Sequence, residues 1–169
     1  MSKQARTPDG QTDAETDAGT EADVGADPEP DADYTPATSG AESVIHALEN
    51  AGIEAAFGVQ GGAIMPVYDA LYHSDIRHVT MAHEQGAAHA ADAFGVVRNG
   101  PGVCLATSGP GSTNLVTGIA DANMDSDGLL ALTGQGPSDM VGAHALQETH
   151  TTRVTAPVTK HHYFAAGPG

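Results

Sequence analysis

The sequence predicts an α/β domain, a doubly wound parallel sheet with helices on both faces, preceded by an acidic N-terminal tail. Between residues 39 and 163, segments with helical spacing of apolar residues alternate with short, continuous apolar runs. Strands that lack strict alternation are typical of a parallel sheet buried on both sides. Small-residue turns recur where these strands are expected to end, and that edge is where such sheets bind ligands.

The first 38 residues differ from the rest in composition. They contain ten acidic side chains, and Val24 and Tyr34 are their only large apolar candidates for burial. A stretch of this kind cannot offset the entropy of ordering. We therefore expect a disordered acidic tail over 1–38 and a folded domain over 39–163. The last residues, 164–169, show no pattern that completes a domain, and we expect a truncated end there.

The first half of the domain is expected to run helix, strand, helix, strand. Ser39 is a suitable N-cap for a helix over 40–52. An apolar strand over 53–59 then leads into a glycine turn. A helix over 63–73 and a strand over 76–82 follow.

The second half repeats this alternation. Asn99-Gly100-Pro101-Gly102 should break the helix before it, and Ser112 is placed to cap the next one. The run 158–164 is a candidate for one more strand. In order, the expected elements are the helix 84–97, the strand 102–108, the helix 113–124 and the strand 128–134.

The charge of the chain restricts its partners. The net charge is −16, and the part after the tail still holds twelve acidic and four basic side chains. We expect neither nucleic acid nor an anionic membrane as a partner, because both are polyanions. An acidic, lysine-poor surface is typical of proteins from high-salt cytoplasms, and an ordinary acidic protein is the alternative. With no signal peptide and no apolar run long enough to span a membrane, a cytoplasmic location is expected.

Metal and thiol chemistry are not expected. Cys104 is the sole cysteine and lies in an apolar run, which predicts a core position and no internal disulfide. His83 and His89 are six residues apart, whereas a helical zinc site needs histidines at i and i+4. We expect capping or surface histidines there.

Glu84 is the most informative residue. It follows an apolar strand and opens a helix whose first residues are mostly small, with no Lys or Arg nearby in sequence. The helix dipole alone could explain a carboxylate at this position. A carboxylate buried without a cation instead favours its neutral form, which donates a hydrogen bond. Both interpretations remain open from the residues alone.

Gly109-Pro110-Gly111 also opens a helix after a strand, so its amides could hold an anion. The turn matches neither the P-loop nor the dinucleotide-binding pattern. A glycine turn without a ligand and a nucleotide-binding domain are both left open by this motif.

Several long motifs carry a resemblance to one family. They are FGVQGGAIMPVYDAL (57–71), HEQGAAHAADAFG (83–95), CLATSGPGSTNLVTGIADANMDS (104–126), LTGQGPSDMVGAHALQE (132–148) and PVTKHHY (157–163). In this order and spacing they resemble the N-terminal, pyrimidine-binding domain of the acetolactate (acetohydroxyacid) synthase large subunit. The resemblance covers about residues 39–163, the whole part expected to fold.

The resemblance implies a thiamine diphosphate enzyme that condenses pyruvate with a second 2-ketoacid in branched-chain amino acid biosynthesis. Glu84 would hydrogen-bond the pyrimidine of the cofactor and set its tautomer. Pro110 and Asn114 would help to seat the pyrimidine, and Gly61 and Gly62 would allow close approach of the backbone. Gln147 would lie beside the reacting centre.

The family also holds Mg²⁺ and FAD, but the diphosphate and metal motifs, Gly-Asp-Gly and Asn-Asn, do not occur in this sequence. We therefore expect an N-terminal part that is inactive alone, working as a homodimer or with a complementing chain that carries the diphosphate-binding domain. Two alternatives remain. The chain could be one subunit of a split 2-ketoacid decarboxylase, or a non-catalytic dimerising or regulatory module.

Overall fold

The computed structural model describes residues 39–143, 145 and 147–165. The chain divides into two units between Thr35 and Pro36, and all described residues belong to the second. The predicted tail over 1–38 lies outside the described residues, as do 166–169 of the predicted truncated end. Within the described part, no helix is both long and apolar enough to cross a membrane.

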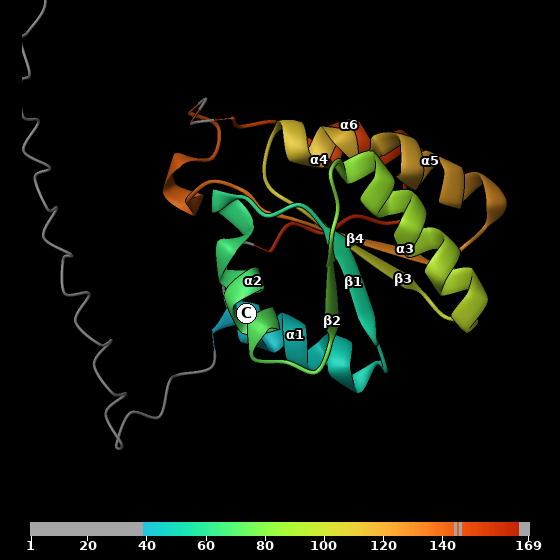
Figure 1. The fold of residues 1–169 in the computed structure, drawn as a ribbon. Helices are drawn as coiled ribbons and strands as arrows, with labels where there is room; N and C mark the ends of the chain where they lie inside the picture. Colours follow the sequence, from blue (N-terminus) through green and yellow to red (C-terminus); the bar gives the residue numbers. More distant parts are fainter. Residues whose placement is uncertain (1–38, 144, 146, 166–169) are drawn as a thin grey trace, which may run out of the picture. The chain divides into compact units, whose positions relative to one another are not determined.

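A parallel four-stranded sheet forms the centre of the domain (Figure 1). Its strands are β1 (Ala55–Gly58), β2 (Arg77–Thr80), β3 (Gly102–Ala106) and β4 (Leu129–Thr133), in the order β2-β1-β3-β4. Neighbouring strands pair in parallel throughout. The chain crosses from one side of β1 to the other after β2, so the direction of winding reverses between β1 and β3. Such a reversal places a crevice at the carboxyl ends of these two strands.

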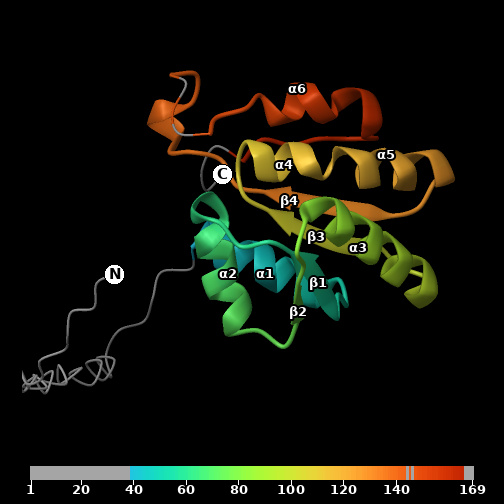
Figure 2. The ribbon, with the colours of Figure 1, turned by 45° about the horizontal axis from the view of Figure 1, so that its top comes forward.

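Helices α1 (Gly40–Asn50) and α2 (Met65–Tyr72) cover one face of the sheet (Figure 2). The predicted N-cap is confirmed, because Ser39 and Glu42 form a reciprocal capping box. A short 3₁₀ turn, η1 (Gly62–Ile64), precedes α2. Buried side chains from both helices and from the sheet form the core on this side: Ile45, Leu48, Ala56, Ile64, Tyr68, Leu71, Ile76, Val103 and Leu105.

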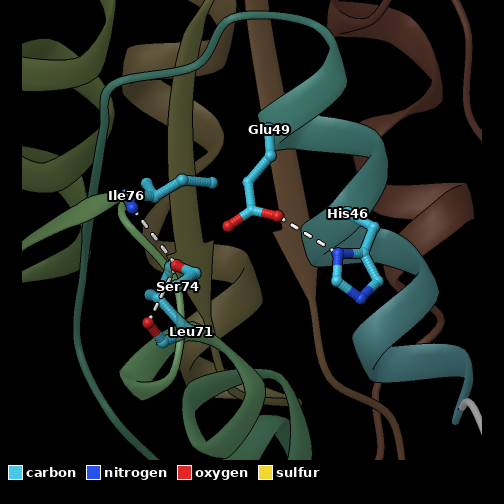
Figure 3. Close-up of polar contacts among 5 residues, drawn as sticks. All are labelled: His46, Glu49, Leu71, Ser74 and Ile76. Carbon is cyan, nitrogen blue, oxygen red and sulfur yellow. Dashed lines mark hydrogen bonds and ion pairs between the residues drawn. The ribbon is translucent and has the colours of Figure 1, made fainter.

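A serine turn joins α2 to β2 (Figure 3). The Ser74 hydroxyl donates to the Leu71 carbonyl at 2.9 Å and accepts from the Ile76 amide at 3.2 Å. Because Ile76 is buried in the core, this turn fixes where β2 begins. Figure 3 also shows Glu49 on α1, 3.1 Å from His46 Nδ1. This carboxylate lies near the end of α1 that leads into β1, and so on the side of the sheet where the strands begin.

Helices α3 (Glu84–Arg98) and α5 (Val116–Asp125) cover the other face. Their contacts use small residues, since a Cβ added at Gly118 of α5 would overlap Ala88 of α3. A Cβ at Gly102 in β3 would overlap the carbonyl of Ala91 in the same way. The predicted break after α3 is confirmed by Asn99, which caps the helix in the left-handed conformation (φ 55°). The doubly wound class is therefore confirmed.

The helix predicted over 113–124 with Ser112 as its cap is wrong at its start. A separate short helix, α4 (Pro110–Asn114), begins directly after Gly109, and α5 follows it. Gly109 adopts φ +56°, which favours glycine, and Pro110 supplies the fixed φ of a first helical residue. Ser112 lies inside α4, where its hydroxyl donates to the Gly109 carbonyl at 2.8 Å.

The candidate strand over 158–164 is also wrong. The chain forms α6 (Thr151–Thr155) and the 3₁₀ turn η3 (Ala156–Val158), and residues 159–165 form no strand. Thr151 of α6 lies 2.9 Å from the buried Ser112 hydroxyl, oxygen to oxygen. This contact holds α6 against α4, and the stretch that follows has no paired strand beside it. His161 and His162 in this stretch are exposed.

Candidate active site

The turns at the carboxyl ends of the strands meet in space, as the sequence predicts. A Cβ at Gly61, after β1, would lie 2.5 Å from the Cβ of Thr107, after β3. A Cβ at Gly134, after β4, would overlap the backbone of Ala63. Larger residues at these two positions would push the turns apart. The glycines thus bring the ends of β1, β3 and β4 together at the point where the winding reverses.

Glu84 is the first residue of α3, on the side of the sheet where the strands end, and it is 8% exposed. His83 is the N-cap residue, and its Nδ1 accepts from the Gln85 amide at 3.1 Å. This confirms the expectation of a capping histidine. Because the carboxylate lies at the helix N-terminus, the helix dipole offsets part of the cost of its burial. No described Lys, Arg or His forms an ion pair with it.

Asn114 holds the Glu84 carboxylate from the opposite helix. Its Nδ2 donates to Glu84 Oε2 at 2.9 Å, across 30 positions of sequence. Gly111 lies beside the other oxygen, since a Cβ there would come within 3.3 Å of Oε1. One carboxylate oxygen is therefore fixed by an amide, and the other adjoins a residue without a side chain.

Replacing Asn114 by Ala should lower the free energy of unfolding by about 1–2 kcal/mol, because the buried Glu84 carboxylate loses its donor. Urea unfolding followed by circular dichroism measures this. Asn123→Ala is the matched control, since Asn123 is exposed on α5 and gains the same helix propensity. Equal effects at the two positions would mean that the Asn114–Glu84 contact contributes nothing.

The structure places the other expected site residues along the same edge. Gly61 packs on Thr107, whereas nothing lies within 4 Å of a Cβ built on Gly62. Pro110 is exposed at the first position of α4. Gln147 adopts φ 57°, and its backbone lies against Gly109, where a Cβ would overlap its carbonyl. Glu84 and Asn114 are in direct contact, and no hydrogen bond to the carboxylate is found from the other four residues.

Thr107 is a residue of this site that the sequence did not single out. Its side chain lies between Gly61 and Gly111, within 2.5 and 2.7 Å of the positions where their Cβ atoms would be. It therefore forms the contact surface between the first and third turns. Its place directly before Ser108-Gly109-Pro110-Gly111 was the available signal.

Tyr68 of α2 was also missed, because its helical spacing predicts only a core position. Its hydroxyl has no hydrogen-bond partner among the described residues. It lies close to the end of β1, since a Cβ at Gly58 would be 2.5 Å from the hydroxyl oxygen. Burial, and then the charges of Cys104 and Glu84, raise the pKa of Tyr68 to about 12. The hydroxyl therefore keeps its proton at neutral pH.

Two further sequence predictions are confirmed. Cys104 is fully buried in β3, and burial raises the pKa of its thiol to about 12, so it is a core residue. His89 lies on the surface of α3, with Nδ1 3.3 Å from Asp121 Oδ2 of α5. Among the described residues, no group of three or more His, Cys, Asp and Glu side chains is placed to hold a metal ion.

Comparison with protein families identifies the domain. Residues 38–154 match the model described as the thiamine pyrophosphate enzyme, N-terminal TPP binding domain. The chain belongs to this family. Glu84, buried where the winding of the parallel sheet reverses, therefore lies in a thiamine pyrophosphate binding domain.

Relatives within this family are named acetolactate synthases. The acetolactate synthase large subunit of Corynebacterium glutamicum is 50% identical over 131 residues, 77% of this chain and 21% of that protein. A probable acetolactate synthase large subunit of Methanocaldococcus jannaschii is 52% identical over 124 residues, 73% of this chain and 21% of its own length. The isozyme 1 large subunit of Escherichia coli K12 is 50% identical over 126 residues, 74% of this chain and 22% of that protein. The chain spans about a fifth of the length of these relatives.

Proposed function

We propose that this chain is the pyrimidine-binding part of a thiamine diphosphate-dependent acetolactate synthase. The observation that carries this proposal is the Glu84 carboxylate, which is 8% exposed, has no ion-pair partner among the described residues, and is held by Asn114. The names of relatives about 50% identical over 73–77% of the chain support the same activity.

The residues present fit the pyrimidine end of thiamine diphosphate. When bound, this cofactor supplies the chemistry that decarboxylates pyruvate and joins the product to a second 2-ketoacid. Glu84 would share a proton with a ring nitrogen through Oε1, the oxygen beside Gly111. Asn114 would keep the carboxyl group in one orientation by donating to Oε2. Pro110 and Gly62, both exposed, would contact the ring, and Gln147 would face the substrate.

The described residues do not fit the charged end of the cofactor. No cluster of three acidic, histidine or cysteine side chains among them could hold Mg²⁺, and Mg²⁺ prefers carboxylate ligands together with phosphate oxygens. We propose that the diphosphate, Mg²⁺ and FAD of the complete enzyme are bound by polypeptide other than residues 39–165. A complementing chain that carries the diphosphate-binding domain would complete the site in the cytoplasm, and a homodimer of this chain is the other assembly that we propose.

A chimera tests this function. Residues 39–163 would replace the matching segment of the Escherichia coli isozyme 1 large subunit, and acetolactate formation from pyruvate would be measured. We expect activity that depends on thiamine diphosphate and Mg²⁺. A chimera that folds and binds the cofactor without forming acetolactate would contradict the proposed activity. Cofactor-dependent release of carbon dioxide without acetolactate would favour the decarboxylase alternative.

We further propose that the acidic domain is suited to high salt, and Asp92 offers a test. Burial, and then the nearby Asp127, Asp121 and Asp125, raise the pKa of Asp92, whereas His89 acts in the opposite direction. The charged form of Asp92 therefore opposes folding. This cost is present at neutral pH and decreases as the pH falls through the raised pKa.

Asp92→Asn should raise Tm by about 1–3 °C at pH 7 in low salt. The gain should shrink in molar KCl, which screens the repulsion, and also as the pH is lowered. Differential scanning calorimetry at two salt concentrations measures this, with the exposed Asp69→Asn of α2 as the control. An equal gain in low and high salt would contradict the role of like-charge repulsion.

A further inference from the structure

The break between α3 and β3 contains the dipeptide Asn99-Gly100. The chain has three other asparagines, and a residue with a side chain follows each of them: Asn50 precedes Ala, Asn114 precedes Leu and Asn123 precedes Met. Because glycine lacks a Cβ, its backbone nitrogen can approach the preceding side chain with the least hindrance. Asn99 is therefore the asparagine of this chain whose carboxamide is most open to attack by the backbone nitrogen that follows it.

The surroundings of this dipeptide are open to water. Asn99 and Gly100 are both exposed. They line a cavity of about 360 Å³ beside the residues that precede β3 and β4, and Asp127 lies in the same lining. None of the candidate active-site residues lines this cavity. The proposed catalytic chemistry therefore does not account for the motif.

The end of α3 holds the dipeptide in a conformation that does not allow the attack. Asn99 has φ 55° and ψ 43°. The Gly100 amide donates to the Gly95 carbonyl at 3.0 Å, and the Asn99 amide donates to the Val96 carbonyl at 3.2 Å, which together form a Schellman cap. For the attack, the Gly100 nitrogen must lose its proton and turn towards Cγ of Asn99. Both changes require the cap to open.

We propose that Asn99 is a site of spontaneous deamidation, and that opening of the last turn of α3 controls its rate. First, the Gly100 nitrogen forms a bond to Cγ of Asn99, and the bond from Cγ to Nδ2 breaks. Nδ2 leaves as ammonia with the proton of the Gly100 amide, and a cyclic imide remains. Water then opens the imide. Opening at Cγ gives aspartate, and opening at the backbone carbonyl gives isoaspartate, in which the main chain runs through Cγ.

Either product weakens the end of α3. Each adds a negative charge at the helix C-terminus, where the helix dipole is already negative, and Asp127 shares the same cavity. Isoaspartate also lengthens the main chain at the residue that forms the cap. Because Glu84 is the first residue of this helix, deamidation at one end loosens the element that carries Glu84 at the other.

The rates of deamidation in the folded and the unfolded chain test the proposal. The full 169-residue chain would be incubated at mildly alkaline pH, either folded in KCl or unfolded in guanidinium chloride. Mass spectrometry of proteolytic fragments locates each product, and released ammonia gives an independent rate. In the unfolded chain, Asn99 should react at least about tenfold faster than the other three asparagines, because glycine follows it alone. Folding should slow Asn99 by at least about tenfold, because the cap must open first.

Gly100→Ala tests the site itself. It places a Cβ beside the attacking nitrogen, in a position with open space around it. In the unfolded chain, the rate at Asn99 should then fall to that of Asn50, which alanine already follows. An Asn99 rate equal to that of Asn50 in the unmodified unfolded chain would overturn the proposal.

Ala93→Gly tests the control by α3. Ala93 is exposed in the second half of the helix, and glycine there should speed the reaction of folded Asn99 by about fivefold, because it lowers helix propensity. Ala47→Gly makes the same change at an exposed position of α1 and should leave the rate within about twofold. If Ala93→Gly fails to fold, the comparison of the folded and unfolded unmodified chain still decides. Equal rates at Asn99 in these two states would overturn the control by α3. None of these measurements involves thiamine diphosphate, so their failure would leave the proposed function untouched.

Discussion

Glu84→Gln is expected to lower acetolactate formation by the chimeric enzyme by about 10²–10⁴-fold, the range of a lost acid–base group. Glutamine keeps the size of the side chain and can still contact Asn114 Nδ2. It cannot hold or release the proton that the proposed role of Glu84 requires. Steady-state turnover with pyruvate, at saturating thiamine diphosphate and Mg²⁺, measures the loss.

Glu49→Gln is the matched control for this substitution. It makes the same chemical change on α1, whose residue Glu49 is shown in Figure 3, near the end of the helix that leads into β1. Turnover of this control should stay within about twofold of the unmodified chimera, because surface substitutions of this kind have small effects. A Glu84→Gln chimera that turns over at a similar rate would show that Glu84 plays only a structural part at the helix N-terminus.

Gly102→Ala is expected to cost about 2–4 kcal/mol in the free energy of unfolding. A Cβ at Gly102 would overlap the carbonyl of Ala91. The contacted atoms belong to the backbone of α3 and the Cβ position is fixed by the backbone of β3, so neither group can rotate away and α3 would have to move off β3. Since Glu84 begins α3, we also expect this variant to weaken the active site. Urea unfolding monitored by circular dichroism measures the loss of stability.

Gly100→Ala, two residues earlier in the same turn, is the control. Nothing lies within 4 Å of a Cβ built on Gly100, and its φ is not in the left-handed region. Alanine there reduces the freedom of the unfolded chain, so we expect a change within about 1 kcal/mol. If the two substitutions had equal effects, the close packing of α3 on β3 would not be the cause.

The sequence predicted the parallel sheet and the position of Glu84 because both depend on local signals. Apolar runs marked the strands, and the helix pattern placed Glu84 at the start of α3. The boundary between α4 and α5 was missed because Ser112 has the chemistry of an N-cap. In the structure its hydroxyl is instead buried against Thr151, a contact across 39 positions that local pattern cannot reveal.

The rest of the site depends on contacts between distant segments. The hydrogen bond from Asn114 to Glu84 joins two helices that cross at the sheet edge, and only the fold brings them together. Thr107 was not predicted as a site residue, because only the fold places its side chain between Gly61 and Gly111. The expected strand over 158–164 failed for a related reason. Its composition suits a strand, but a strand also needs a neighbouring strand to pair with, and residues 159–165 pair with none.

In the proposed function, Glu84 hydrogen-bonds the pyrimidine of thiamine diphosphate. The most direct test is the ¹⁵N chemical shift of thiamine diphosphate labelled at its pyrimidine ring nitrogens, bound either to the unmodified chimera or to its Glu84→Gln variant. We predict that one ring nitrogen shifts towards its protonated value in the unmodified chimera and returns towards the value of the free cofactor in the variant. The same shift in both proteins would contradict the account.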